Sequence, residues 1–240
     1  MQYFYVTGTS RGLGRALYEI LVQDDDAFVF GIARGDGPKH PQYRHTTLDL
    51  ADVAAVSAFR FEPLPDATRI VLVNNAAVMS MIHIGSASPE TIANTFAVNA
   101  VAPAILTNAF VATYASTGAD LVVCNLMTGG VRNAVDGGAL YGGSKAALDY
   151  MTRVGAEEAR VVGRGSLRFM SIMPGSLDTE MQEQLRALDP ADYPLANTFR
   201  ARYEAGQLLP PDQVAARIRK VLLNPALAPD TVLNLSDLPA

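Results

Sequence analysis

The sequence contains little cysteine, little charge and no long apolar run, and each shortage excludes a class of protein. Its single cysteine, Cys124, cannot form an intramolecular disulfide, which excludes a disulfide-stabilised secreted domain. No uninterrupted apolar stretch approaches the roughly 18 residues that indicate a membrane span. The first residues lack the basic start and the apolar core of a signal peptide. We therefore expect a soluble, cytoplasmic protein with no membrane partner and a buried, reduced Cys124.

Basic residues are too few to form a nucleic-acid surface. Nineteen Lys and Arg residues stand against 24 Asp and Glu residues, which gives a formal net charge of −5 without a basic stripe. The three histidines, His40, His45 and His83, are spaced unlike the ligands of common metal sites, so we expect them to be loop residues. Apolar residues make up 49% of the 240 residues, which excludes a disordered chain. The sequence predicts an ordered protein that binds neither nucleic acid nor a metal.

Apolar segments of strand length alternate with helical patterns along the whole chain. Strands are expected at residues 3–7, 28–33, 70–73, 121–126, 167–173 and 231–235, with a further short segment ending at 48–50. Helices are expected up to 22, at 51–59, 89–114 and 140–161, and from 211, whereas 176–206 reads as irregular. This alternation predicts an α/β fold, a single Rossmann-like domain over residues 1–240 with a mostly parallel, doubly wound sheet and helices on both faces. Ligands of such a sheet bind beyond the carboxyl ends of its strands.

A glycine-rich turn, residues 7–14, separates the first strand from the first helix. Gly8 allows the tight turn, Gly12 lets the backbone approach a pyrophosphate at the helix start, and Gly14 permits close packing of helix on strand. The Gly-Lys-Ser/Thr ending of a P-loop is absent. A methyltransferase-like site would favour an acidic residue at the end of the second strand. The turn therefore predicts a nucleotide site.

The residues after the second strand indicate which dinucleotide binds. Arg34 lies about 20 residues past Gly14, where an NAD site places Asp or Glu. Arginine there suits the 2′-phosphate of NADP(H), and Arg11 adds a second positive charge within the turn. Asp36 would serve as the ribose acid if the strand ended two residues later. We expect NADPH as the cofactor, with NAD(H) as the less favoured alternative.

Tyr141 and Lys145 lie at the start of the helix expected after residue 140. Residues at i and i+4 share a helix face, so both side chains are expected to face one crevice. A nearby cation favours the phenolate, so we expect Lys145 to lower the pKa of Tyr141. Tyr141 would then act as a general acid–base at a carbonyl or alcohol.

With these motifs the sequence resembles the short-chain dehydrogenase/reductase family, and the resemblance covers nearly the whole chain. The matching positions are the glycine turn Thr7–Gly14, Asp49 in Leu48-Asp49-Leu50, Asn74-Asn75-Ala76-Ala77, Asn99, the Tyr141/Lys145 pair, and Pro174-Gly175-Ser176-Leu177-Asp178-Thr179. The resemblance implies cofactor contacts by Gly8, Ser10, Arg11, Gly12, Leu13, Gly14, Arg34, Asp49, Leu50, Asn75, Ala76, Tyr141, Lys145, Pro174, Gly175, Leu177 and Thr179. It also implies a homodimer or homotetramer.

Two positions depart from the family pattern. The family's catalytic serine, 13 residues before the tyrosine, is Thr128 here. Threonine keeps a hydroxyl for the substrate carbonyl, although its methyl group stiffens the side chain and narrows the site. Ala77 replaces the last glycine of the Asn-Asn-Ala-Gly motif, so that turn must avoid a positive φ or accept strain.

The resemblance implies a reaction in which hydride moves between NADPH and a carbonyl. Tyr141 would donate the proton, Thr128 would hold the carbonyl oxygen, Lys145 would lower the tyrosine pKa and contact the nicotinamide ribose, and Asn99 would anchor a water. The alternative is a regulatory protein that binds NADP(H) without turnover.

Apolar side chains near the strand ends suit a compact, largely apolar ketone or vicinal dicarbonyl. Residues 176–206 would cover the substrate. The candidate lining residues are Leu177, Met181, Leu185, Phe199, Met79, Met81 and Met127, and each methionine could instead fill a gap in the core. Residues 206–222 also resemble the sepiapterin-reductase-like branch of the family, which includes bacterial reductases of aromatic diketones.

Overall fold

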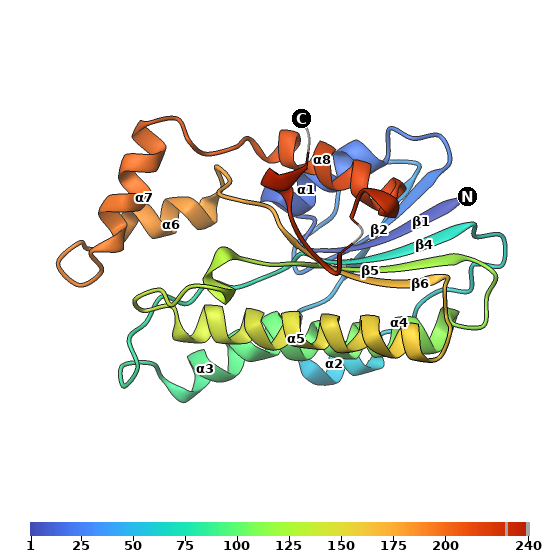
Figure 1. Cartoon of the computed structure of the whole chain (residues 1–240), viewed down its shortest axis with the longest axis horizontal. Helices are drawn as coiled ribbons and strands as arrows, with labels where there is room; N and C mark the ends of the chain where they lie inside the picture. The colour runs from blue at the N-terminus through green and yellow to red at the C-terminus, as the bar shows by residue number, and fades with distance from the viewer. Residues whose placement is uncertain (229, 239–240) are drawn as a thin grey trace.

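A computed structural model describes residues 1–228 and 230–238 of the chain. Within this part, seven strands form one parallel sheet in the order β3-β2-β1-β4-β5-β6-β7 (Figure 1). The strands are β1 (Gln2–Thr7), β2 (Ala27–Ala33), β3 (Tyr43–Thr47), β4 (Arg69–Asn74), β5 (Asp120–Leu126), β6 (Leu167–Met173) and β7 (Val232–Asn234). The predicted α/β fold with a doubly wound parallel sheet is confirmed.

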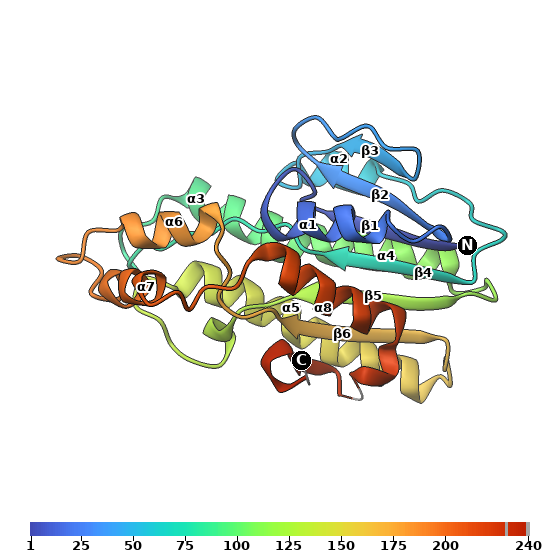
Figure 2. The same cartoon turned by 90° about the horizontal axis from the view of Figure 1, so that it is seen from above.

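Helices cover both faces of the sheet (Figure 1). One face carries α1 (Gly12–Leu21) and α8 (Pro211–Leu223). The other carries α2 (Val53–Ala58), α4 (Ala102–Tyr114) and α5 (Ala139–Val161), with α3 (Pro89–Phe96) leading into α4. Two more helices, α6 (Glu180–Ala187) and α7 (Leu195–Glu204), extend beyond the carboxyl ends of the strands (Figure 2). This is the edge at which ligands of such sheets bind.

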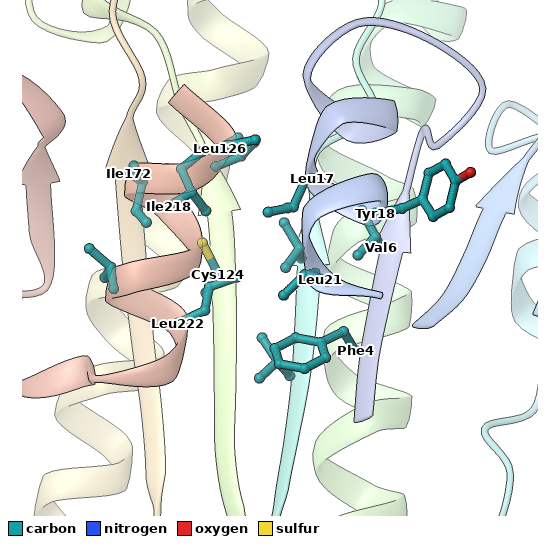
Figure 3. Close-up of a cluster of buried hydrophobic side chains, with 14 of the residues drawn as sticks. Phe4, Val6, Leu17, Tyr18, Leu21, Cys124, Leu126, Ile172, Ile218 and Leu222 are labelled. Carbon is teal, nitrogen blue, oxygen red and sulfur yellow. The ribbon is translucent and has the colours of Figure 1, made fainter. Parts of the chain in front are cut away.

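Each face of the sheet has its own apolar core, because successive side chains of a strand point to opposite sides. Phe4 and Val6 of β1 pack under α1 and α8, while Tyr5 belongs to the core beneath α4. Figure 3 shows the core that contains Phe4 and Val6, to which Leu17 and Leu21 of α1 also belong. Cys124 lies fully buried in it, and burial raises the pKa of its thiol to about 12. The expected buried thiol is confirmed.

Local capping explains where two helices begin. The side chain of Asp52 accepts a hydrogen bond of 2.9 Å from the backbone N–H of Ala55 at the start of α2. The Ser88 hydroxyl accepts one of 3.2 Å from Thr91 N–H, and Pro89 occupies the first helical position of α3. Asp and Ser are among the residues that favour the N-cap position, and proline favours the first helical position.

The long helix expected at 89–114 is interrupted by a π-helical turn, Ala97–Val101. By length and composition, Pro89–Tyr114 is the one segment of the described residues that could cross a membrane. In the fold it lies against the sheet, with Leu106 and Phe110 buried in the core. Helices of this kind are ordinary in sheet proteins, since one face of the helix covers the strands.

The structure corrects two sequence-based expectations. Residues 176–206 are not irregular, because they contain α6 and α7, in which Leu185 and Ala196 are buried. Both helices are short and mostly polar, so the sequence shows only a scattered helical pattern there. His45 is not a loop residue but lies within β3, an edge strand whose burial pattern is mixed.

Candidate active site

The order of the strands reverses between β1 and β4, and this switch point opens a crevice at the carboxyl edge. The glycine turn follows β1, and Asn75 and Ala76 follow β4. The hydroxyl of Thr7 accepts hydrogen bonds of 3.0 Å from the backbone N–H groups of Asn75 and Ala76. The Asn75 side-chain amide donates to the Thr7 carbonyl oxygen at 2.8 Å. These hydrogen bonds join the end of β1 to the loop that follows β4.

The glycines of the turn are required by its geometry. Gly8 has φ 77° and Gly12 has φ 54°, both in the left-handed region that disfavours other residues. A Cβ atom on Gly14 would lie 2.2 Å from the carbonyl oxygen of Gly8. No side chain caps the amides that begin α1, where Arg11 is the N-cap. These features fit the pyrophosphate of a dinucleotide, since free amides and the helix dipole favour an anion there.

The segment after β6 lies beside this turn. Gly175 takes φ 88°, and the segment is then fixed by backbone hydrogen bonds between Ser176–Asp178 and Leu209. The Thr179 methyl carbon lies 3.6 Å from the position that a Cβ on Gly12 would occupy. Arg11 forms an ion pair with Glu180 at the start of α6. The fold therefore brings the predicted residues of the turn and of the 174–179 segment together, while the Leu177 side chain is buried in the core.

The residues expected at the adenosine end follow β2 and β3. Strand β2 ends at Ala33, so Arg34 is the first residue beyond it; its side chain is exposed and makes no ion pair among the described residues. Asp36 is also exposed. Asp49 accepts a hydrogen bond of 3.0 Å from Ala51 N–H just after β3, whereas Leu50 is buried in the core.

Tyr141 and Lys145 lie one turn apart near the start of α5, as predicted. The Tyr141 hydroxyl lies 3.8 Å from the sulfur of Met181, on the first turn of α6. The Lys145 ammonium is buried and donates a hydrogen bond of 2.7 Å to the carbonyl oxygen of Leu126. The pair therefore joins the end of β5 to the covering helix α6.

The expected lowering of the Tyr141 pKa is wrong for this conformation. Burial raises the pKa of the phenol to about 12, because the charged phenolate loses its solvation. Burial also lowers the pKa of Lys145 to about 8, since the ammonium is the charged form that is disfavoured. In this state Lys145 bonds to Leu126, and Tyr141 stays protonated near neutral pH.

Asn99 lies inside the π-helical turn between α3 and α4 and is fully buried. Its side chain exchanges hydrogen bonds with the backbone of Val78, at 2.8 and 2.9 Å, and donates to the Ser144 hydroxyl at 3.1 Å. Ser144 in turn donates to the Tyr141 carbonyl oxygen at 2.9 Å. Sequence analysis missed Ser144 as the link between Asn99 and the tyrosine helix; its only signal was its place between Tyr141 and Lys145.

Thr128 follows β5, and its hydroxyl accepts a hydrogen bond of 3.3 Å from Gly130 N–H. Its side chain is half-buried and remains a donor, since this contact uses the oxygen only as an acceptor. Ala77, the other departure, causes no strain: no residue other than glycine has a positive φ in the described ranges. Among the same residues no group of acidic, histidine and cysteine side chains could hold a metal ion.

The candidate substrate-lining residues divide into two groups. Met127 packs with Leu148 and Met173 in a small separate core, and Leu177 and Leu185 are also buried. Met181 instead contacts the hydroxyl of Tyr141. The side chains of Met79, Met81 and Phe199 are half-buried on the loop after β4 and on α7.

Comparison with known proteins adds an independent result. The family described as short chain dehydrogenase matches residues 2–189. A benzil reductase ((S)-benzoin forming) of Bacillus cereus is 30% identical over 236 residues, covering 92% of this chain and 94% of that protein. A sepiapterin reductase of Meriones unguiculatus is 29% identical over 229 residues, covering 85% of this chain and 84% of that protein. A solved short chain dehydrogenase/reductase of Saccharomyces cerevisiae has a TM-score of 0.86 at 22% identity, with 100% of both chains covered.

The sequence match, the fold, and the glycine turn with the Tyr141/Lys145 pair all indicate the same family. The solved yeast structure shares the fold, and the family match confirms the resemblance noted in the sequence. The chain therefore belongs to the short-chain dehydrogenase family, whose members are oxidoreductases that act on carbonyl or alcohol groups with a nicotinamide cofactor.

Proposed function

We propose that this short-chain dehydrogenase uses NADPH to reduce a ketone or vicinal dicarbonyl of a small, largely apolar substrate to the alcohol. The observation that carries the proposal is the contact between the Tyr141 hydroxyl and the Met181 sulfur, 3.8 Å apart. This contact places the proton donor next to an apolar, polarisable side chain of α6. The similarity to a benzil reductase, named for an aromatic diketone, supports the same substrate class.

The chain's own residues have distinct roles in this proposal. Tyr141 donates a proton to the carbonyl oxygen, and its raised pKa keeps that proton in place at neutral pH. The Thr128 hydroxyl donates a hydrogen bond to the same oxygen as charge develops on it. Lys145 contacts the nicotinamide ribose and supplies positive charge near Tyr141. Asn99 anchors a water through which the proton is replaced. The bound nicotinamide supplies the hydride.

Cofactor binding in the proposal involves the segments that follow β1, β2, β3, β4 and β6, together with the start of α5. The contacting residues are Gly8, Ser10, Arg11, Gly12, Leu13, Gly14, Arg34, Asp49, Leu50, Asn75, Ala76, Tyr141, Lys145, Pro174, Gly175, Leu177 and Thr179. NADPH is preferred over NADH because Arg34 has no ion-pair partner among the described residues and lies directly after β2. Residues 1–240 form a single cofactor-binding domain covered by the 176–206 segment.

The protein is proposed to act in the cytoplasm as a homodimer or homotetramer. The exposed apolar side chains on α5 include Tyr150, Met151 and Val154, which supports contact with a second copy.

The test is NADPH consumption by the purified protein across aryl diketones, simple aryl ketones, sugars and 3-oxoacyl thioesters at matched concentrations. The proposal expects the highest kcat/KM on an aryl diketone or aryl ketone. A highest value on a sugar or an acyl thioester would contradict the substrate class but leave the reductase assignment intact. Tight NADPH binding without turnover of any carbonyl would favour the regulatory alternative.

A further inference from the structure

A chain of hydrogen bonds runs from the glycine turn to the loop after β2. The Thr9 hydroxyl lies 2.8 Å from the Tyr43 hydroxyl, which lies 2.9 Å from Nδ1 of His45. Nε2 of the same imidazole lies 2.7 Å from the carbonyl oxygen of Gly35. Thr9 and Tyr43 are buried. The chain therefore connects the two segments proposed to hold the pyrophosphate and the adenosine ribose.

Two glycines show that the backbone is shaped around this chain. A Cβ on Gly31 would lie 1.9 Å from the Tyr43 hydroxyl, so the phenol crosses β2 at a position that admits no side chain. A Cβ on Gly37 would lie 2.3 Å from Cγ of His45, so the loop after β2 lies directly on the imidazole. The Tyr43 ring also packs on Tyr18 of α1, with centroids 4.7 Å apart. The loop residue bonded to His45 is Gly35, which stands between Arg34 and Asp36.

The carbonyl at one end fixes the direction of the hydrogen bonds. A carbonyl only accepts, so Nε2 of His45 must carry a proton. In the neutral imidazole, Nδ1 accepts from Tyr43, and Tyr43 accepts from Thr9. His45 therefore donates to the loop after β2 through Nε2 and is held in place by the buried Tyr43 through Nδ1.

We propose that His45 is a positioning residue that sets the preference for NADPH over NADH. It holds Gly35 so that Arg34, and not Asp36, meets the adenosine ribose. The inference rests on the proposed NADPH use. The other titratable or charged side chains on the elements that contact this chain are Tyr18, Arg34, Asp36, Lys39, His40, Tyr43, Arg44 and Asp49.

Two variants of His45 test its hydrogen bond to Gly35. His45→Gln keeps an amide donor for Gly35, and His45→Ala removes the donor. Tyr43→Phe keeps the ring and breaks the chain between Thr9 and His45 while the imidazole remains. His40→Gln is the matched control, because His40 lies in the loop after β2 and its Nδ1 accepts a hydrogen bond of 3.2 Å from Gln42 N–H, outside the chain.

The experiment measures dissociation constants of NADPH and NADH by cofactor fluorescence, which is free of tryptophan background since the chain has no tryptophan. Folding of each variant is monitored by circular dichroism. The 2′-phosphate itself titrates near pH 6, as phosphate monoesters do, so all proteins are compared at one pH well above this value.

We expect His45→Ala to bind NADPH about tenfold more weakly than the unmodified protein, because Gly35 loses its donor, and one hydrogen bond contributes roughly 1 kcal/mol. Its NADH affinity should be unchanged. His45→Gln should keep most of the preference for NADPH, since its amide still donates to Gly35, whereas Tyr43→Phe should lower it. KM for NADPH should rise with kcat retained in His45→Ala and Tyr43→Phe, while His40→Gln behaves as the unmodified protein.

A NADPH-to-NADH affinity ratio in folded His45→Ala and Tyr43→Phe that equals the ratio of the unmodified protein would overturn the role of His45. Equal affinities for the two cofactors in the unmodified protein would instead overturn the proposed NADPH use itself, so the two failures are distinct.

Discussion

The ammonium of Lys145 donates a hydrogen bond of 2.7 Å to the carbonyl oxygen of Leu126, the last residue of β5. This bond fastens the helix that carries Tyr141 to the strand that precedes Thr128. The site is buried, and burial lowers the pKa of Lys145 to about 8. Its positive charge is therefore retained at neutral pH and lost in mildly alkaline solution.

The Lys145 charge predicts the pH dependence of carbonyl reduction. The lysine is charged below pH 8 and neutral above it, whereas Tyr141, with a pKa raised to about 12, stays protonated throughout. We expect kcat/KM, which reports pKa values of the free enzyme, to be level below pH 8 and to fall above it. Any activity left in Lys145→Arg should not fall at pH 8, since guanidinium stays charged. A level profile of the unmodified protein from pH 7 to 10 would contradict this role of Lys145.

The proton donor is tested by Tyr141→Phe, which keeps the ring but removes the acid. Turnover should fall by at least about 100-fold, the contribution typical of a general acid. The affinity for NADPH should barely change in this variant, whereas Lys145→Ala should lower both turnover and cofactor affinity. Steady-state turnover and NADPH binding are measured on the same preparations of each variant. Turnover close to that of the unmodified protein in the Phe variant would refute the assignment.

The sequence was sufficient to predict the sheet, because buried strands such as residues 70–73 are continuous apolar runs. The motif spacing also predicted the glycine turn and the Tyr141/Lys145 pair, since both are local in the chain. The Lys145 bond to Leu126 could not be predicted, because it depends on how α5 packs against β5. The same holds for the chain from Thr9 to His45, which joins the turn after β1 to β3. Local sequence patterns predict helices, strands and motifs, whereas the contacts between them depend on the three-dimensional fold.

Cofactor choice is tested at Arg34. Arg11 is engaged by Glu180, so Arg34 is the arginine that we expect to contribute more to binding of the 2′-phosphate. A charge-assisted hydrogen bond contributes about 1.5–3 kcal/mol, and its loss should weaken NADPH binding roughly 10- to 100-fold in Arg34→Asp. NADH binding should be unchanged or stronger, and Arg11→Ala should have the smaller effect. Dissociation constants for both cofactors measure this, and a variant that still prefers NADPH would contradict it.

The role of Thr128 is tested by two replacements that differ in the hydroxyl. Thr128→Ser keeps the donor and removes the methyl group, so activity should be retained or rise. Thr128→Val is nearly isosteric but has no hydroxyl, so kcat should fall heavily while the fold is kept. It also leaves Gly130 N–H without its 3.3 Å acceptor, so thermal stability is measured alongside kcat. Equal activity of the Ser and Val variants would make Thr128 a purely structural residue.

Met181 provides the sharpest test of the substrate class, because its sulfur lies 3.8 Å from the Tyr141 hydroxyl on the first turn of α6. A substrate whose carbonyl reaches Tyr141 must lie near this thioether. Met181→Ala removes part of an apolar wall, worth about 1 kcal/mol for a half-buried side chain, so KM for an aryl diketone should rise roughly fivefold. Met181→Leu conserves the volume and should stay close to the unmodified protein. Both variants keep the acid and the lysine, so kcat should change less than KM. An unchanged KM in Met181→Ala, with KM for small aliphatic ketones also unchanged, would place the substrate elsewhere in the crevice.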